Sequence, residues 1–215
     1  MGSQDRVSSG PGKSGHHLVR EVRSWTVAHQ VFVAGVILVV TAAGSAATSD
    51  LVFDRLGGFT LSAKVAGVLI IPVIGAMAIG AAWRHDAPIS VPLHPRLFWW
   101  RIVWIAGWIA LVAAASCTGQ LFGSQVLTGA VVRNVLIFVL ITGVCQLFGV
   151  PRIAWMVTFS YTMTLLFFGA IGDDGRALWW SAPIDSSVSS VQLAVFGALC
   201  AAVVVLVSVR RPRAR

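Results

Sequence analysis

Six long apolar stretches constrain this chain more than any other feature of its sequence. They cover residues about 28–48, 63–83, 98–117, 128–149, 153–172 and 190–209. Each approaches the roughly 20 residues that cross a ~30 Å hydrocarbon core as an α-helix. Because the runs are continuous, they predict helices rather than the alternating strands of a barrel. We therefore expect an all-α fold, a polytopic transmembrane bundle of about six helices within residues 25–209.

The composition favours a bilayer as the solvent of this bundle. Hydrophobic residues make up 57% of the 215 residues and charged residues 11%, with a mean hydropathy of +0.83. Soluble domains carry about 25% charged residues. The net charge of +8 could indicate nucleic acid. However, most basic residues lie between or beyond the apolar runs, and no basic stripe alternates with aromatic residues. We expect the lipid bilayer as partner and no nucleic acid.

Basic residues predict how the bundle is oriented. Twelve of the 16 basic residues fall on one side, in both tails, in the 84–97 loop, at Arg101 and at Arg152. Five of the eight acidic residues fall on the opposite side, with Arg55, Lys64 and Arg176. Because Lys and Arg are retained on the cytoplasmic side, both termini are expected there, in the plasma (inner or cytoplasmic) membrane. The 1–24 tail, rich in Ser, Gly and charge, is expected to be disordered, and 210–215 forms a short basic tail.

The first apolar run has a second interpretation. A basic segment precedes it and the small residues Ser45-Ala46-Ala47 end it, as in a cleaved signal peptide. The run is long for such a peptide. Cleavage would leave five spans without changing the side of the C-terminus.

No catalytic or metal-binding pattern is present. Cys117, Cys145 and Cys200 share no C-x-x-C spacing. Gly12-Lys13-Ser14 ends like a phosphate-binding loop, but Val7 stands where the first glycine is needed. No Asp or Glu lies at mid-depth in any predicted span. We expect no enzymatic activity and no cofactor.

The polar pair Arg133-Asn134 lies within the fourth predicted span. An Arg in a span is costly, so it usually faces protein, water or headgroups. Arg133 could snorkel outward, or mark the elbow where an interfacial helix of about 123–132 turns into the membrane. It could instead bind a substrate or pair helices, with Asp173 and Asp174 as the nearest candidate counter-charges.

Trp100, Trp104 and Trp108 recur every four residues on one face of the third span. Trp99 and Trp100 fit an interfacial aromatic belt. Trp104 and Trp108 lie deeper, so they either pack against other helices or form the wall of a site for an amphiphilic substrate.

The 84–97 loop is the longest cytoplasmic connection that we expect to be ordered, and three prolines stiffen it. It is either an inert connector or a docking surface for a partner, and its candidate residues are Arg84, His85, His94 and Arg96, with Arg152 from the 150–152 turn.

Two local features bear on helix packing. Pro72, in the middle of the second run, is expected to kink that helix. Small residues at helical spacing permit close helix contact, within a bundle or in a homodimer; the pairs are Ala76/Gly80, Ala110/Ala114 and Gly197/Ala201.

A sparse pattern covers about 133–183. It consists of Arg133-Asn134, Gly143, Leu147-Phe148-Gly149, Ala154-Trp155, Tyr161, Phe168-Gly169, Trp179-Trp180 and Pro183. With this pattern and its Lys-poor usage, the chain resembles small six-span actinobacterial membrane proteins grouped with permease subunits of ABC-type exporters. The resemblance implies a permease-like subunit that works with a separate cytoplasmic ATPase. The alternative is a non-transporting membrane protein with an immunity, scaffold or sensor-accessory role.

Overall fold

The computed structural model describes residues 31–56, 59–83, 95–169 and 179–209, and these are mostly helical. The α-helices of the described residues are α2 (Val31–Ala47), α3 (Pro72–Ala82), α4 (Pro95–Ser116), α5 (Thr128–Leu147), α6 (Ala154–Phe168) and α7 (Ser190–Val209). Three apolar segments, Phe98–Phe122, Thr128–Leu147 and Ser190–Val209, are long enough to cross a membrane. Val31–Ala47 and Gly67–Ala82 are shorter apolar helices. The predicted helical fold is therefore confirmed at this coarse level.

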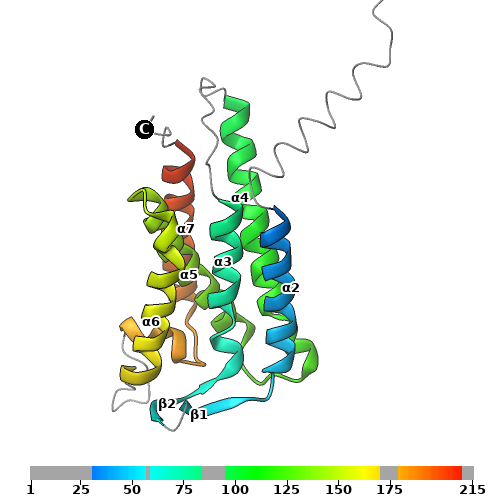
Figure 1. Ribbon diagram of the computed structural model, residues 1–215, viewed down its shortest axis with the longest axis vertical. Coiled ribbons are helices and arrows are strands. Elements are labelled where there is room, and N and C mark those ends of the chain that lie inside the picture. The colour runs from blue at the N-terminus through cyan, green and yellow to red at the C-terminus, as the bar shows by residue number, and fades with distance from the viewer. Residues whose placement is uncertain (1–30, 57–58, 84–94, 170–178, 210–215) are drawn as a thin grey trace, which may run out of the picture.

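Successive helices alternate in direction, so their connections gather at two ends of the molecule (Figure 1). One end, here called the hairpin end, holds a β-hairpin and the 3-10 helices η2 (Thr118–Phe122) and η4 (Trp179–Ile184). The other, the terminal end, holds the start of α2, the end of α7 and the turn with η3 (Pro151–Ile153). Helix α5 is central, because 61% of its apolar stretch is buried inside the molecule, against 17% of the corresponding stretch of α7.

The expected second span is wrong at its start. Residues 63–66 belong to strand β2 (Phe59–Ala66), which pairs antiparallel with β1 (Val52–Leu56). A register shift interrupts the pairing between Phe53 and Arg55. The sequence carried a hairpin signal, because a Gly-Gly dipeptide at 57–58 separates two runs rich in β-branched and aromatic residues. Apolar periodicity alone could not separate this strand from a helix.

Pro72 does not kink a helix, contrary to the expectation. It occupies the first turn of α3, preceded by η1 (Gly67–Leu69). Proline suits this position because it has no N–H and the first helical N–H groups lack intrahelical partners anyway. The helix therefore begins at the proline instead of bending around it.

Polarity in the bundle is inverted relative to a soluble protein. Large apolar side chains lie exposed on the outer helix faces, among them Phe32, Val39, Leu111, Phe159, Leu199 and Leu206. The buried polar side chains are Thr41, Ser45, Ser116, Arg133, Asn134, Thr142, Thr158, Thr162, Ser181 and Ser208. Several of their hydroxyls donate to the carbonyl four residues earlier, as Thr142 does to Phe138 at 2.9 Å. Most of these polar groups thus lie inside with hydrogen-bond partners while apolar groups face outward, and the Ser116 hydroxyl is an exception among the described residues.

Glycines set the closest helix contacts. A Cβ added at Gly75 of α3 would collide with Val112 of α4, and one at Gly143 of α5 would collide with Val203 of α7. Of the small residues singled out above, Ala76 is buried. Nothing lies within 4 Å of a Cβ at Gly197, and Ala110 and Ala114 are exposed. Ala110, Ala114 and Gly197 therefore make no close helix contact within the described bundle. A homodimer that forms through them stays a prediction.

The remaining predicted boundaries differ by a few residues. Helix α7 matches the sixth predicted span, α5 ends two residues earlier than the fourth, and α6 ends at Phe168 rather than near 172. Positions 170–172, the 1–24 tail and the 210–215 tail lie outside the described residues.

Candidate functional site

Arg133 is fully buried near the start of α5, at the hairpin end. Its Nη1 donates to the Ser187 carbonyl at 2.6 Å, and its Nη2 donates to the Asp185 carbonyl at 2.6 Å. Nε and Nη2 both donate to Oδ1 of Asn134 at 3.2 Å. The planar guanidinium, with donors in a fixed fork, suits this spread of acceptors. The side chain therefore bonds α5 to the segment that follows η4.

Asn134, also fully buried, completes the arrangement. Its Nδ2 donates to the Leu69 carbonyl at 2.9 Å and to the Pro183 carbonyl at 2.7 Å. One amide thus joins the end of η1 to η4 across the first turns of α5. We call Arg133, Asn134 and the four carbonyls that they bind the Arg133–Asn134 network.

Tyr161 of α6 extends the same contacts. Its hydroxyl donates to the Trp180 carbonyl at 2.6 Å, and its ring meets that of Phe138 edge-on, with centroids 6.4 Å apart. Residues Ser181 to Ile184 of η4 are buried beneath these contacts. The η4 segment is thereby tied into the core at the hairpin end of the molecule.

Two of the expectations for Arg133 are wrong. The side chain does not snorkel outward, because it has no exposed surface. No elbow helix covers 123–132, because η2 ends at Phe122 and α5 runs without interruption from Thr128. The side chain is instead buried with oxygen acceptors, so each guanidinium nitrogen has a partner and the desolvation of the charge is offset. Asp173 and Asp174 lie outside the described residues.

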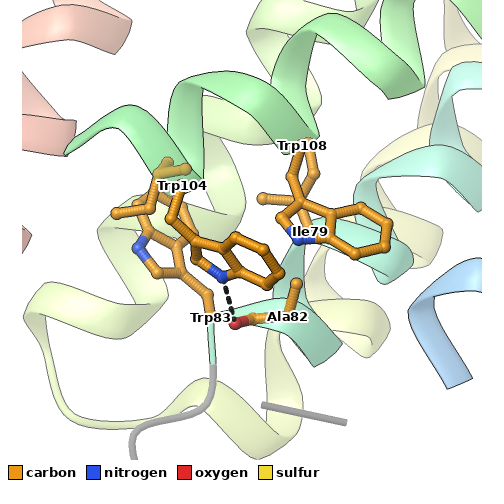
Figure 2. A pocket seen from close by; sticks show the side chains of 6 residues that line it. Ile79, Ala82, Trp83, Trp104 and Trp108 are labelled. Atoms are coloured by element: carbon orange, nitrogen blue, oxygen red, sulfur yellow. Dashed lines mark hydrogen bonds between the residues drawn. The ribbon is translucent and has the colours of Figure 1, made fainter. Parts of the chain in front are cut away.

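A second cluster lies nearer the terminal end, where α3 meets α4. Trp104 and Trp108 of α4 contact edge-on, with ring centroids 5.8 Å apart. Trp83, directly after α3, is 1% exposed and lies beside them (Figure 2). We call these three residues the tryptophan cluster. Sequence analysis missed Trp83, and only its place at the end of an apolar run could have suggested it.

The described contacts of this cluster are packing contacts, and the wall of a substrate site stays a prediction. With Ile79, Ala82 and Ile105 it lines a recess of about 140 Å³ that is too narrow to admit a water molecule. Nε1 of Trp104 donates to the Ala82 carbonyl at 3.5 Å (Figure 2). A Cβ at Gly143 would lie 3.2 Å from the Trp83 ring, so that ring fills the space beside α5. The Trp83 Nε1 is buried with no hydrogen-bond partner among the described residues.

The structure does not bring the two clusters into one site. Arg133 and Asn134 bond to η1, η4 and the segment after η4. Trp104 and Trp108 face α3 in a recess that none of those partners lines. A second recess, of about 220 Å³, lies between β2, α5, α6 and η4. It is lined almost wholly by apolar side chains, with Thr162 the polar exception.

The predicted docking loop falls largely outside the described residues, as Arg84, His85 and His94 do. Arg96 lies in the first turn of α4, and Arg152 is exposed in η3 at the same end of the molecule (Figure 1). Nearby, Nη1 of Arg101 donates to the Ser208 carbonyl at 3.4 Å and so links α4 to α7. Within the described part of the chain, no three His, Cys, Asp or Glu side chains are placed to hold a metal ion.

Comparison with protein-family models, curated proteins and solved structures finds no match for this chain. The resemblance to exporter permease subunits therefore stays a prediction from the sequence.

Proposed function

We propose that the chain is a multi-pass protein of the cytoplasmic membrane with six membrane-spanning helices. The inverted polarity of the bundle carries this proposal: the large exposed side chains on the outer helix faces are mainly apolar, while Arg133, Asn134 and many hydroxyls are inside. In water such an outer face would be unfavourable by roughly 25 cal/mol per Å² of apolar surface. In lipid it is the expected arrangement, because every polar group must find its partner within the protein.

The terminal end faces the cytoplasm in this proposal. Arg101 and Arg152 lie there, and so does Arg96 at the start of α4. The start of α2 and the end of α7 lie at this same end (Figure 1). Retention of basic residues on the cytoplasmic side then puts the hairpin end outside.

Labelling of single cysteines tests both the span count and the orientation. Cysteine is placed at Gln125, exposed at the hairpin end, or at Arg152, exposed at the terminal end, in a chain whose three native cysteines are replaced by alanine. In intact cells a membrane-impermeant maleimide should label position 125 at once and position 152 only after permeabilisation. Equal labelling of both positions would refute the orientation, and recovery of the chain in the detergent-free supernatant would refute the membrane assignment.

Within the membrane, the function proposed is that of a permease-like subunit of an ABC-type exporter. The sparse 133–183 pattern supports it, together with a basic terminal end that could contact an ATPase. Because the tryptophan recess admits no water molecule, we place the proposed path for an amphiphile outside this recess, between copies or along the lipid-facing surface.

Purification from the native membrane tests this role. The tagged chain should co-purify with a nucleotide-binding subunit and with ATPase activity. The variant Arg152→Glu should lower the yield of that subunit, whereas Gln125→Glu, exposed at the opposite end, should not. A preparation without any nucleotide-binding protein would contradict the exporter role.

The second candidate is a non-transporting membrane protein, such as a scaffold or sensor-accessory subunit. The absence of a water-sized space in the tryptophan recess favours it. It predicts that reconstituted vesicles show no substrate flux, with or without ATP.

A further inference from the structure

The connection between α4 and α5 displays apolar side chains instead of burying them. It consists of η2 and the residues up to Leu127. Leu121 is 84% exposed, Phe122 62% and Leu127 59%. No charged residue occurs between Arg101 and Arg133. Connections in water are usually polar, since an exposed Leu–Phe pair gains nothing there, so this loop has the surface of a segment whose solvent is not water.

Hydrogen bonds hold the loop in place. The buried hydroxyl of Ser45, in α2, accepts from the Gly119 N–H at 2.9 Å and donates to the Ser116 carbonyl at 2.6 Å. The Thr118 hydroxyl is 2.8 Å from the Ala42 carbonyl, and Nε2 of Gln120 donates to the Val126 carbonyl at 2.7 Å. The outward direction of Leu121 and Phe122 is therefore built into the fold.

Glycine ends the 3-10 turn that carries this apolar pair. Gly123 follows η2 with φ = 95°, in the left-handed region that glycine adopts without strain. The chain reverses here, and Leu121 and Phe122 are left at the edge of the molecule.

The loop lies directly beyond the hairpin end of α2, whose last residue is Ala47. Helix α2 contacts η2 along its hairpin end (Figure 1). The loop thus adds apolar surface directly beyond α2, continuous with exposed side chains of α2 and α4 such as Val40 and Leu111. The hairpin on the other flank carries an exposed charge, Arg55.

We propose that this loop is an interfacial anchor whose partner is the lipid bilayer. Leu121 and Phe122 insert at the boundary between headgroups and acyl chains in the leaflet on the hairpin side. Amphipathic anchors bury their apolar face roughly 5–10 Å into the boundary between headgroups and acyl chains. Insertion extends the apolar surface of the bundle beyond the hairpin end of α2, which η2 contacts. The inference rests on the proposed membrane-spanning function.

Collision accessibility of nitroxide spin labels tests the anchor. The full chain, with its three native cysteines replaced by alanine, is reconstituted into phosphatidylcholine–phosphatidylglycerol nanodiscs with one label at a time. The labelled positions are Phe122 in the anchor, Leu111 on the lipid-facing side of α4, and Gln125, exposed in the same loop. Oxygen concentrates in lipid, and a polar nickel chelate stays in water. The ratio of oxygen to nickel collisions should be several-fold higher at Phe122 than at Gln125, and should approach the ratio at Leu111.

The other outcomes each overturn something specific. A ratio at Phe122 equal to that at Gln125 would put the loop in water and refute the anchor while leaving the spans intact. Low collision with both reagents at Phe122 would mean that protein, for example a second copy, covers the pair, and would also refute it. A water-like ratio at Leu111 would refute the membrane-spanning function itself.

A double substitution gives a second readout that does not depend on a label at the insertion site. With the label at Leu127, Leu121→Ser/Phe122→Ser should lower the oxygen-to-nickel ratio, because the loop would rise toward water. The matched control Ser124→Ala/Gln125→Ala, in the same loop, should leave the ratio unchanged. Both altered pairs lie mainly outside the core, so the elution volume in detergent should stay that of the parent chain. An unchanged ratio in the serine variant would overturn the anchor.

Discussion

The Arg133–Asn134 network and the tryptophan cluster are both buried between helices, but they differ in how well their side-chain nitrogens are hydrogen-bonded. In the network, every nitrogen of the Arg133 guanidinium and the Asn134 amide has an acceptor between 2.6 and 3.2 Å. In the tryptophan cluster, the Trp104 donor lies 3.5 Å from the Ala82 carbonyl, and the Trp83 donor has no acceptor among the described residues. Hydrogen bonds therefore hold the helices together at the hairpin end, whereas packed aromatic rings do so near the terminal end.

The largest expected effect comes from removing the guanidinium. Arg133→Ala leaves the carbonyls of Ser187 and Asp185 and Oδ1 of Asn134 without their donor. At about 1–3 kcal/mol for each buried unsatisfied group, partly relieved by relaxation, the free energy of unfolding should fall by about 3–5 kcal/mol. The measurement is SDS-induced unfolding in mixed micelles, followed by tryptophan fluorescence.

Arg133→Lys and Arg152→Ala sharpen that result. Lysine keeps the charge but cannot span the separate acceptors. The free energy of unfolding of Arg133→Lys should therefore lie between that of Arg133→Ala and that of the wild type. Arg152 is exposed, and its replacement should change stability by less than about 0.5 kcal/mol. If Arg133→Lys were as stable as wild type, the charge rather than the fork would matter.

The amide of Asn134 is expected to come next. Asn134→Ala removes the donor to the Leu69 and Pro183 carbonyls, and should cost about 2–3 kcal/mol. It should also release η4 locally, which faster hydrogen exchange at residues 181–184 would reveal. Asn134→Asp keeps the size but loses both donors, so a stability close to wild type would contradict the role given to Nδ2.

The sequence predicts the long apolar helices but not their local partners. Composition and run length are enough to place α5 and α7, because a continuous apolar run of about 20 residues is typical of a helix that can cross a membrane. They could not separate β2 from α3, since the apolar run passes through both and only Pro72 marks the true helix start. Arg133-Asn134 could be singled out as costly in a span. Its acceptors could not, because they are backbone carbonyls, which every residue has.

Trp83 illustrates the same limit in the tryptophan cluster. Nothing in its spacing relates it to Trp104 and Trp108, since the three meet only when α3 packs on α4. The glycine that makes room for its ring, Gly143, lies 60 positions further along the chain in α5. Contacts of this kind depend on tertiary arrangement and leave no local pattern.

A smaller effect is expected where the ring of Trp83 meets α5. Gly143→Ala puts a methyl group against Val203 and beside the Trp83 ring, and overpacking of this kind costs about 1–3 kcal/mol. The control is Gly197→Ala in α7, where nothing lies within 4 Å of the added Cβ. That variant should be neutral or slightly stabilising, because alanine favours the helix. Equal unfolding midpoints for the two variants would show that α5 and α7 are not in close contact.

The smallest effect is expected for the substitution Trp83→Phe, and it separates the two regions most clearly. Trp83→Phe removes a buried N–H that has no acceptor among the described residues, so the loss of ring volume is offset by the removal of an unsatisfied donor. The change in unfolding free energy should be within about 1 kcal/mol, far below that of Asn134→Ala, although Trp83 is the larger side chain. Trp83→Ala, which empties the space beside Gly143, should cost about 3–5 kcal/mol. A Phe variant as unstable as the Ala variant would mean that the indole N–H has a partner in the native membrane, and the two regions would then follow the same rule.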